Sequence, residues 1–323
     1  MTIYDVFNGD ADGICSLLQL RLQNPKESTL VTGVKRNINL LRGLSIEKGD
    51  ELTILDVSLL KNRLELDNAL AVGANVFYAD HHQAGDIPEH PNLSVHINPS
   101  AEMCTGLIIN EYLENKHLLW ALTAAFGDNL IDRANNLGND HAIEPKQLAL
   151  LKNLGTFINY NGYGSSLEDL FFHPAELFKT LLAYTSPLDF IADNNPAFTT
   201  LEEGYTSDLE QASNTTAVQH STTTAAFILP NQRWARRVGG VYGNDLANKH
   251  PNRAHAVLTE QTNNDNKGYL VSIRAPLTNK VNADTLASQF PTGGGRKGAA
   301  GINFLPEEKL TEFLQCLEAQ YKT

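Results

Sequence analysis

Short apolar runs alternate with helical patterns along the first third of the chain. The apolar runs cover residues 2–7, 29–34, 51–58 and 76–80, and the segments with helical spacing cover residues 14–22, 37–44 and 59–73. This order predicts the arrangement β-α-β-α-β-α-β, which is typical of a doubly wound parallel sheet of the α/β class. Ligands gather at the carboxyl ends of the strands in such sheets, so the residues that follow each strand are the first candidates for function.

The pattern changes twice further along the chain. A strand at 93–99 precedes a mainly helical region at 104–182, and a stretch rich in Asn, Thr, Ser and Asp covers 186–224, with a helix expected near 201–213. Strands return at 225–230, 238–243, 254–261 and 268–276, followed by a helix at 282–290, a glycine-rich turn at 292–301 and a final helix begun by Pro306. We therefore expect a first domain at 1–185, a connector at 186–224 and a smaller α+β domain at 225–323.

Composition narrows the class of protein. The chain has 323 residues, of which 42% are hydrophobic, and this suffices for two folded cores. We expect a cytoplasmic protein without a membrane anchor, because no apolar run is long enough, no secretory signal is evident, and the three cysteines form no CxxC pair. The net charge of −12 disfavours a grip on long duplex nucleic acid, but it permits a small phosphorylated ligand in a locally basic pocket.

Two aspartates follow the first predicted strand in the sequence NGDADG. Asp10 and Asp12 are two residues apart, and Gly9 and Gly13 relieve the backbone so that a tight turn can aim both carboxylates into one crevice. Such a loop is also compatible with a simple turn. A calcium-binding EF-hand is excluded because an apolar helix begins where further ligands would be required.

Further ligand types follow the next strands. Asp56 ends an apolar strand, where a carboxylate must be paired, used as a helix cap or bound to a metal. In ADHH, Asp80 precedes His81 and His82, and this triplet can supply an imidazole ligand, a charge stabiliser and a carboxylate that fixes a ring tautomer. Because three strands deliver these groups to one edge, we interpret them as a site for Mn²⁺ or Mg²⁺. Two such ions about 3.5 to 4 Å apart would suit an in-line phosphoryl displacement.

Five motifs occur in order along the chain: NGDADG, ILDVS, ADHH, AFGDN and TGGGRKGAAG. In this order they resemble the DHH phosphoesterase superfamily with a C-terminal DHHA1 domain, which includes RecJ-like exonucleases and nanoRNA or pAp phosphatases. The resemblance covers nearly the whole chain. It implies two divalent ions, foremost Mn²⁺, in a catalytic DHH domain at 1–185, and a substrate-binding DHHA1 domain at 225–323.

The resemblance also implies a role for each residue of the site. Asp56 would bridge the two ions, and Asp10 would bind one of them. His82 would stabilise the transferred phosphoryl group, with Asp80 in support. The second ion would be bound by three residues: Asp12, His81 and Asp128. The assignment of Asp128 rests on the resemblance alone, because a GDN turn is by itself usually a helix cap.

Several other residues are candidates for holding the substrate. Ser272 and Arg274 alternate onto one face of a strand, and arginine is suited to bidentate phosphate contacts. The glycine run could bring backbone N–H groups to a phosphate, or be no more than a flexible loop. It comprises Gly293, Gly294 and Gly295. Lys35 and Arg36 follow the second strand, where surface charges are also ordinary. Thr105 could contact a phosphate at a helix start or act as a plain N-cap.

Two positions depart from the family pattern. Asn8 stands where family members commonly have His or Asp, so one ion loses a charged or imidazole ligand. Arg296 stands where the glycine motif commonly ends in His. A guanidinium group cannot ligate a metal but can hold a phosphate or carboxylate, so the substrate is expected to differ from that of well-known members.

We therefore expect a metal-dependent phosphoesterase that hydrolyses a phosphoester or phosphodiester in a small nucleotide or short oligonucleotide. One alternative is a RecJ-like single-strand exonuclease, which the NGDADG motif favours and the lack of a basic, aromatic-rich channel disfavours. The other alternative is a nucleotide-binding or regulatory protein without turnover, which the departures at Asn8 and Arg296 motivate.

Overall fold

The computed structural model describes residues 1–263 and 265–322, which divide into two compact units at Gly204 and Tyr205. Residues 264 and 323 fall within the expected C-terminal domain and lie outside the described residues. The division lies inside helix α9 (Pro196–Ser213). The segment at 186–224 thus carries regular structure where its composition indicated little, namely α8 (Pro187–Ala192), α9 and strand β6 (Ala217–His220).

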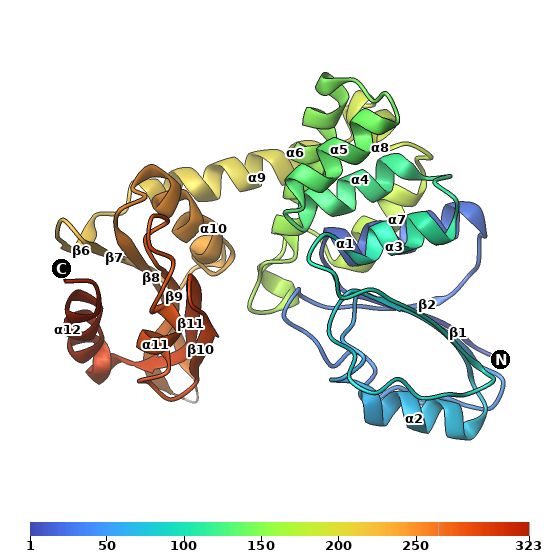
Figure 1. The fold of residues 1–323 in the computed structure, drawn as a ribbon, viewed down its shortest axis with the longest axis horizontal. Helices are drawn as coiled ribbons and strands as arrows, with labels where there is room; N and C mark the ends of the chain where they lie inside the picture. The colour runs from blue at the N-terminus through green and yellow to red at the C-terminus, as the bar shows by residue number, and fades with distance from the viewer. Residues whose placement is uncertain (264, 323) are drawn as a thin grey trace. The chain divides into compact units, whose positions relative to one another are not determined.

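The first unit contains a five-stranded sheet in the order β2-β1-β3-β4-β5, in which every neighbouring pair is parallel. Its strands are β1 (Ile3–Phe7), β2 (Thr29–Val31), β3 (Glu51–Leu55), β4 (Asn75–Asp80) and β5 (Leu93–Ile97). Helices α1 (Ala11–Gln23) and α3 (Thr105–Tyr112) lie on one face of this sheet and α2 (Arg63–Val72) lies on the other (Figure 1). The predicted doubly wound α/β sheet is confirmed.

The helix predicted at 37–44 is wrong, because this segment forms turns. The side chain of Asn62 satisfies its backbone instead: Nδ2 donates to the carbonyl of Ile38 (2.6 Å), and Oδ1 accepts from the backbone N–H of Leu41 (3.4 Å). Gly43 adopts a left-handed backbone (φ 86°). The apolar spacing that suggested a helix instead buries Leu41 in the core beneath α2.

The helical region predicted at 104–182 is confirmed. Besides α3 it contains α4 (Leu118–Gly127), α5 (Ile131–Asp140), α6 (Pro145–Asn161), the short 3₁₀ helix η1 (Leu167–Asp169) and α7 (Pro174–Leu182). The end of α4 approaches α1 and α6 closely, because a Cβ atom on Gly127 would lie 2.4 Å from Cβ of Ala11 and 2.8 Å from the carbonyl oxygen of Gly155. This contact brings the next residue, Asp128, to the start of α1.

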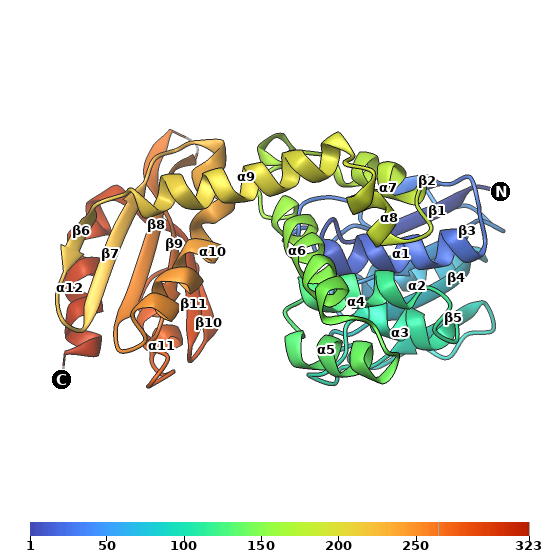
Figure 2. The same cartoon turned by 90° about the horizontal axis from the view of Figure 1, so that it is seen from above.

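The second unit contains a mixed six-stranded sheet in the order β10-β11-β9-β8-β7-β6. Its further strands are β7 (Thr224–Leu229), β8 (Ala254–Asn263), β9 (Asn266–Arg274), β10 (Gly293–Arg296) and β11 (Ala299–Pro306). Helix α10 (Arg233–Lys249) covers one face; α11 (Ala283–Ala287) and α12 (Leu310–Tyr321), which follows the 3₁₀ turn η2 (Glu307–Lys309), cover the other (Figure 2).

Two predictions in the second unit are corrected. Residues 238–243 form part of helix α10, not a strand, because the buried residues Val238, Tyr242 and Leu246 recur at helical spacing along it. Residues 292–301 are not a simple turn, since most of them form the antiparallel hairpin of β10 and β11. Within the described residues no helix has the length and apolarity needed to cross a membrane.

Candidate metal centre

The loop from β1 to α1 presents two carboxylates because its glycines permit unusually close contacts. A Cβ atom on Gly9 would lie 1.9 Å from the carbonyl oxygen of Gly33, and one on Gly13 would lie 2.2 Å from that of Asn8. Asp10 is the N-cap of α1, and its Oδ1 accepts hydrogen bonds from the backbone N–H groups of Asp12 (3.0 Å) and Gly13 (3.1 Å). The turn predicted from NGDADG is thus held by its own capping carboxylate.

Asp12 is oriented by the start of α3. Its Oδ2 accepts from the backbone N–H of Thr105 (2.8 Å), and its Oδ1 accepts from that of Gly106 (2.7 Å). The hydroxyl of Thr105 also lies 3.4 Å from Oδ1 of Asp56. Thr105 is fully buried. Its backbone N–H and its hydroxyl group face the carboxylates of Asp12 and Asp56, not a surface open to a phosphate. The helix N-terminus stabilises the Asp12 carboxylate.

Asp56 follows β3 in a left-handed backbone conformation (φ 55°). Its backbone N–H donates to the carbonyl of Ala79 in the neighbouring strand (3.1 Å). A non-glycine residue in this conformation is strained unless the surrounding structure holds it, and such residues concentrate at functional sites. This turn leaves the carboxylate of Asp56 buried at the carboxyl edge of the sheet.

The two histidines that follow β4 have different surroundings. Nδ1 of His81 lies 3.0 Å from the carbonyl oxygen of Met103 and must carry a proton to donate to it. Its Nε2 is therefore left with a lone pair when the ring is neutral, which is the arrangement found in metal-ligating histidines. Nδ1 of His82 lies 2.7 Å from Oδ1 of the completely buried Asp80. The ring of His82 is about half exposed.

Three carboxylates surround Nε2 of His81. It lies 3.5 Å from Oδ1 of Asp56, 3.9 Å from Oδ2 of Asp12 and 3.9 Å from Oδ2 of Asp128. Two sets of ligand atoms each lie within 4.8 Å of one another, namely those of Asp56, His81 and His82, and those of Asp12, His81 and Asp128. Segments at four separate places in the chain thus supply one mixed carboxylate and imidazole cluster.

The electrostatics of this cluster favour a cation. Burial, and then the carboxylates of Asp10 and Asp12, raise the pKa of Asp56 well above its usual value. Burial and the charge of Asp12 raise the pKa of Asp128 to about 7. Burial by itself would lower the pKa of His81. The carboxylates of Asp12 and Asp128 outweigh burial, so this pKa is raised above its ordinary value. The protein alone leaves negative charge here uncompensated, and a bound divalent cation would neutralise it.

The donor set fits a divalent cation of the Mn²⁺ or Mg²⁺ kind. Carboxylate oxygens and a single imidazole nitrogen suit hard to borderline cations, and no thiolate points to Zn²⁺ among the described ligand groups. The ring orientation fixed by Met103 and the backbone donors on Asp12 are the outer contacts that a metal site requires. These residues can therefore hold a cation, polarise a phosphate ester and position water.

Asp10 is arranged differently from the other carboxylates. Its Oδ2 lies 2.5 Å from Nζ of Lys35, and it belongs to neither group of metal-binding atoms. Burial by itself would raise the pKa of Asp10, but the ammonium group of Lys35 holds this pKa below its usual value. The sequence suggested Lys35 as a substrate contact. Sequence reasoning missed Asn159, whose Oδ1 accepts a hydrogen bond from Nζ of Lys35 (3.0 Å). The polar run NYNGY at the end of an apolar helix was the available signal.

The other candidate substrate residues lie in different environments. Arg36 is exposed beside Lys35. Arg274 donates to Oγ of Ser272 (3.0 Å), to Oδ1 of Asn244 (2.6 Å) and to the carbonyl of Gly240 (3.1 Å), so it also helps to hold α10 on the sheet. Arg274 and Arg296 are both in register with Ala299, which places the two arginines on one face of the sheet.

The three glycines of β10 differ in what they require. A Cβ atom on Gly293 would lie 1.9 Å from the carbonyl oxygen of Ala287, and Gly295 has a positive φ of 147°, so packing and backbone conformation explain both residues. A Cβ atom on Gly294 would meet nothing within 4 Å. The hypothesis that glycine lets a ligand approach the backbone therefore applies best to Gly294, in the edge strand β10.

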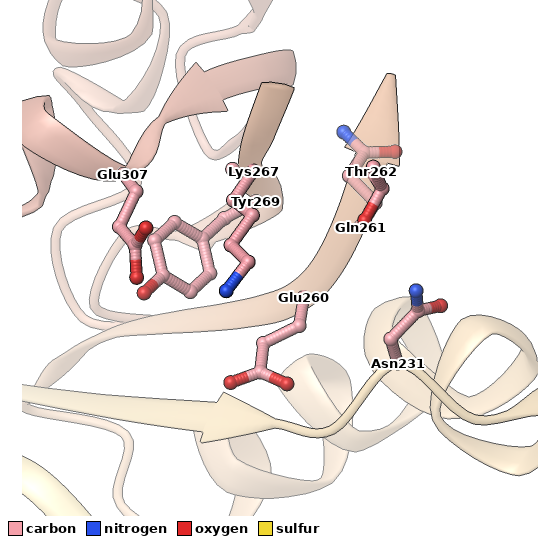
Figure 3. A pocket seen from close by; sticks show the side chains of 8 residues that line it. Asn231, Glu260, Gln261, Thr262, Lys267, Tyr269 and Glu307 are labelled. Carbon is pink, nitrogen blue, oxygen red and sulfur yellow. The ribbon is translucent and has the colours of Figure 1, made fainter. Parts of the chain in front are cut away.

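A separate pocket in the second unit contains none of the expected residues. It is lined by Asn231, Glu260, Gln261, Thr262, Lys267, Gly268, Tyr269 and Glu307 (Figure 3). Glu260 and Glu307 both border it with a single lysine, so its charge does not suit a phosphate.

Comparison with known proteins identifies the class of fold. Residues 223–323 match the DHHA1 domain family. The exonuclease RecJ bound to manganese is similar over 98% of this chain and 89% of its own, with 15% identity and a TM-score of 0.58. RecJ from Thermus thermophilus in complex with Mn²⁺ gives 15% identity and a TM-score of 0.60 over 98% of this chain and 51% of its own.

A third similar structure is the pGpG-specific phosphodiesterase PggH from Vibrio cholerae. It has 14% identity and a TM-score of 0.57, and the similarity covers 99% of this chain and 98% of that protein. No sequence among the curated proteins matches significantly. The chain thus carries a DHHA1 domain at residues 223–323, and its fold is similar to that of RecJ and PggH, in agreement with the resemblance found in its motifs.

Proposed function

We propose that this protein is a metal-dependent phosphoesterase that hydrolyses a phosphoester or phosphodiester of a small nucleotide or short oligonucleotide. One observation carries the proposal: Nε2 of His81, oriented by Met103, faces carboxylate oxygens of three aspartates at 3.5 to 3.9 Å. The similar fold of a phosphodiesterase and of manganese-bound exonucleases supports it.

The residues of the cluster would have different roles according to their positions. Four of them would hold the cation, Mn²⁺ first and Mg²⁺ as the alternative: Asp12, Asp56, His81 and Asp128. A divalent ion held by these residues would withdraw charge from a phosphoryl oxygen and would lower the pKa of water near neutral pH. His82 reaches the edge of the cluster, where its ring can stabilise charge on the phosphoryl group, and Asp80 orients that ring.

The parts of the chain have separate roles in this proposal. Residues 1–185 form the catalytic domain, 186–224 the connector and 225–323 the substrate-binding domain. In the last of these, Arg274 and Arg296 share one face of the sheet and would hold an anionic group of the substrate, with Ser272 and Gly294 beside them. The acidic chain as a whole argues for a small ligand rather than for long nucleic acid, and its three free cysteines fit a cytoplasmic setting.

Hydrolysis by the purified protein tests this function directly. The substrates would be a generic phosphodiester, pAp, cyclic and linear dinucleotides, two- to five-nucleotide RNA and a long single strand, each with Mn²⁺, Mg²⁺ or EDTA. We expect turnover of the small substrates with Mn²⁺ and none with EDTA. Asp56→Asn is the matched control, since it keeps the shape of the side chain while removing the charge, and it should abolish turnover.

The other outcomes select the alternatives. Processive degradation of the long strand would favour a single-strand exonuclease, which the similarity to RecJ makes worth testing. Tight binding of a nucleotide without turnover in saturating Mn²⁺ would favour a binding or regulatory protein. Full activity of Asp56→Asn would contradict the proposed metal site.

A further inference from the structure

An ammonium group lies where the family resemblance calls for one of two metal ions. The resemblance implies that Asp10 binds an ion of its own, with a histidine or aspartate at position 8. Here position 8 is Asn8, and Nζ of Lys35 lies 2.5 Å from Oδ2 of Asp10 and 3.9 Å from Oδ1 of Asp128. The ammonium group therefore contacts the carboxylate that the ion would need.

Lys35 is held in this position from several directions. Its backbone N–H donates to the carbonyl of Gly162 (2.9 Å), and its own carbonyl accepts from Nδ2 of Asn8 (3.3 Å). Nζ also donates to Oδ1 of Asn159 (3.0 Å), whose Nδ2 donates to the hydroxyl of Tyr163 (3.1 Å). Nζ lies 5.8 Å from the centre of the Tyr163 ring, within reach of a cation–π contact. The side chain is thus fixed rather than free in solvent.

The remaining ligands for a second ion are poor. Oδ1 of Asp10 already accepts two backbone N–H groups, and Oδ2 is paired with Lys35. Asn8 offers only a neutral amide oxygen, which is buried and has no hydrogen-bond partner in the described part of the chain. A dication bound by Asn8 and Asp10 would lie next to the ammonium group of Lys35. Two positive charges in contact repel strongly where water is excluded. The residues around His81 therefore fit a cation, whereas those at Asn8 and Asp10 do not fit a second one.

We propose that this site, if it is the phosphoesterase centre proposed above, binds a single divalent cation, and that the ammonium group of Lys35 supplies the second positive charge. The cation belongs at His81, where Asp12, Asp56 and Asp128 converge. Asp128 lies between the two charges, with Oδ2 3.9 Å from Nε2 of His81 and Oδ1 3.9 Å from Nζ of Lys35.

The same group contacts the substrate. Two of the three N–H bonds of Lys35 are directed to Asp10 and Asn159, and among the described residues the third has no hydrogen-bond acceptor, so it can donate to a phosphoryl oxygen. An ammonium group is a point charge that binds phosphate without any requirement for a fixed coordination geometry. Lys35 therefore combines the role of a fixed counter-charge for Asp10 with that of a phosphate contact.

The test is the number of Mn²⁺ ions bound by the full-length protein, measured by calorimetric titration and by the electron paramagnetic resonance spectrum at saturation. We expect one ion per chain and the six-line spectrum of an isolated Mn²⁺. Two ions per chain with a spin-coupled spectrum would overturn the single-cation inference while leaving the phosphoesterase proposal in place. Absence of any bound ion would instead overturn the metal-dependent function itself.

Variants then test the part played by Lys35. Lys35→Met keeps the length of the side chain and removes its charge, and Asn8→His combined with Lys35→Met adds an imidazole ligand as well. We expect the double variant to bind two ions and to give a spin-coupled spectrum. Arg36→Met, which removes a neighbouring exposed charge, is the matched control and should still bind one. A correctly folded double variant that binds one ion would show that Lys35 is not what excludes the second.

Discussion

The imidazole of His82 lies 2.7 Å from the carboxylate of Asp80, which is completely buried and anchored at the end of β4. A carboxylate accepts hydrogen bonds, so Nδ1 carries the proton and the opposite edge of the ring faces outward. The pair resembles other sites in which a buried carboxylate orients a histidine without itself taking part in the reaction.

This relationship predicts different effects for two substitutions. His82→Ala should lower kcat by roughly 10² to 10⁴, because it removes the group proposed to contact the phosphoryl oxygen, and should leave Mn²⁺ affinity nearly unchanged. Asp80→Asn should cause a smaller loss, since it disturbs only the ring orientation. Steady-state kinetics combined with Mn²⁺ titration separate the two cases. A large loss of bound metal in His82→Ala would place this residue among the metal ligands instead.

Removal of the metal should destabilise the first unit. A ligand that binds only the folded state stabilises it by about 2.7 kcal/mol when its concentration is a hundred times Kd. We therefore expect EDTA to lower the unfolding temperature and added Mn²⁺ to raise it in proportion to the logarithm of its concentration. His81→Ala, which loses the nitrogen at the centre of the cluster, should show little response to either. An equal response of wild type and variant would contradict this assignment.

Substrate affinity should depend on Arg296. Its side chain is exposed, so Arg296→Ala should leave the unfolding temperature unchanged. A hydrogen bond to a charged group contributes about 1.5 to 3 kcal/mol, so we expect KM to rise by at least about tenfold with little change in kcat. Arg274 is a poorer test, because it also donates to Asn244 and Gly240 of α10. An unchanged KM would remove Arg296 from the substrate site.

Acid should destabilise the second unit through His255. This side chain is 1% exposed, and burial together with the charges of Arg253 and His250 lowers its pKa to about 4 from an ordinary value of 6.5. Between these values the unfolded chain binds more protons than the folded one, so the free energy of unfolding falls as pH decreases from 6.5 towards 4. Chemical denaturation at several pH values measures this slope. His255→Gln, which does not titrate, should flatten it.

Two glycine substitutions should separate folding from binding. Gly9→Ala places a methyl group 1.9 Å from the carbonyl oxygen of Gly33, so we expect it to lower the free energy of unfolding by about 1 to 3 kcal/mol or more. In Gly294→Ala the methyl group meets no atom within 4 Å, and stability should hardly change. If a ligand approaches the backbone there, Gly294→Ala will instead weaken substrate binding. Equal stability losses in both variants would contradict the packing argument.

The doubly wound sheet can be predicted from the sequence, and so can the edge at which Asp10, Asp56 and His81 gather. These features follow from periodicity and chain order, because a carboxylate that ends a parallel strand must lie at the carboxyl edge whatever packs around it. The same local logic failed at 37–44 and at 238–243. In the first, the backbone groups are hydrogen-bonded by the side chain of Asn62; in the second, apolar residues at helical spacing are buried in helix α10.

The partners of the site residues, by contrast, depend on how the chain packs. Asp128 reaches the cluster because Gly127 packs against Ala11, and no local pattern reports a contact between residues so far apart in the chain. The pairing of Lys35 with Asp10, and its support by Asn159, likewise join three distant segments. A sequence states which groups end each element, whereas the counter-charge of a carboxylate depends on which side chains packing brings within a few ångströms.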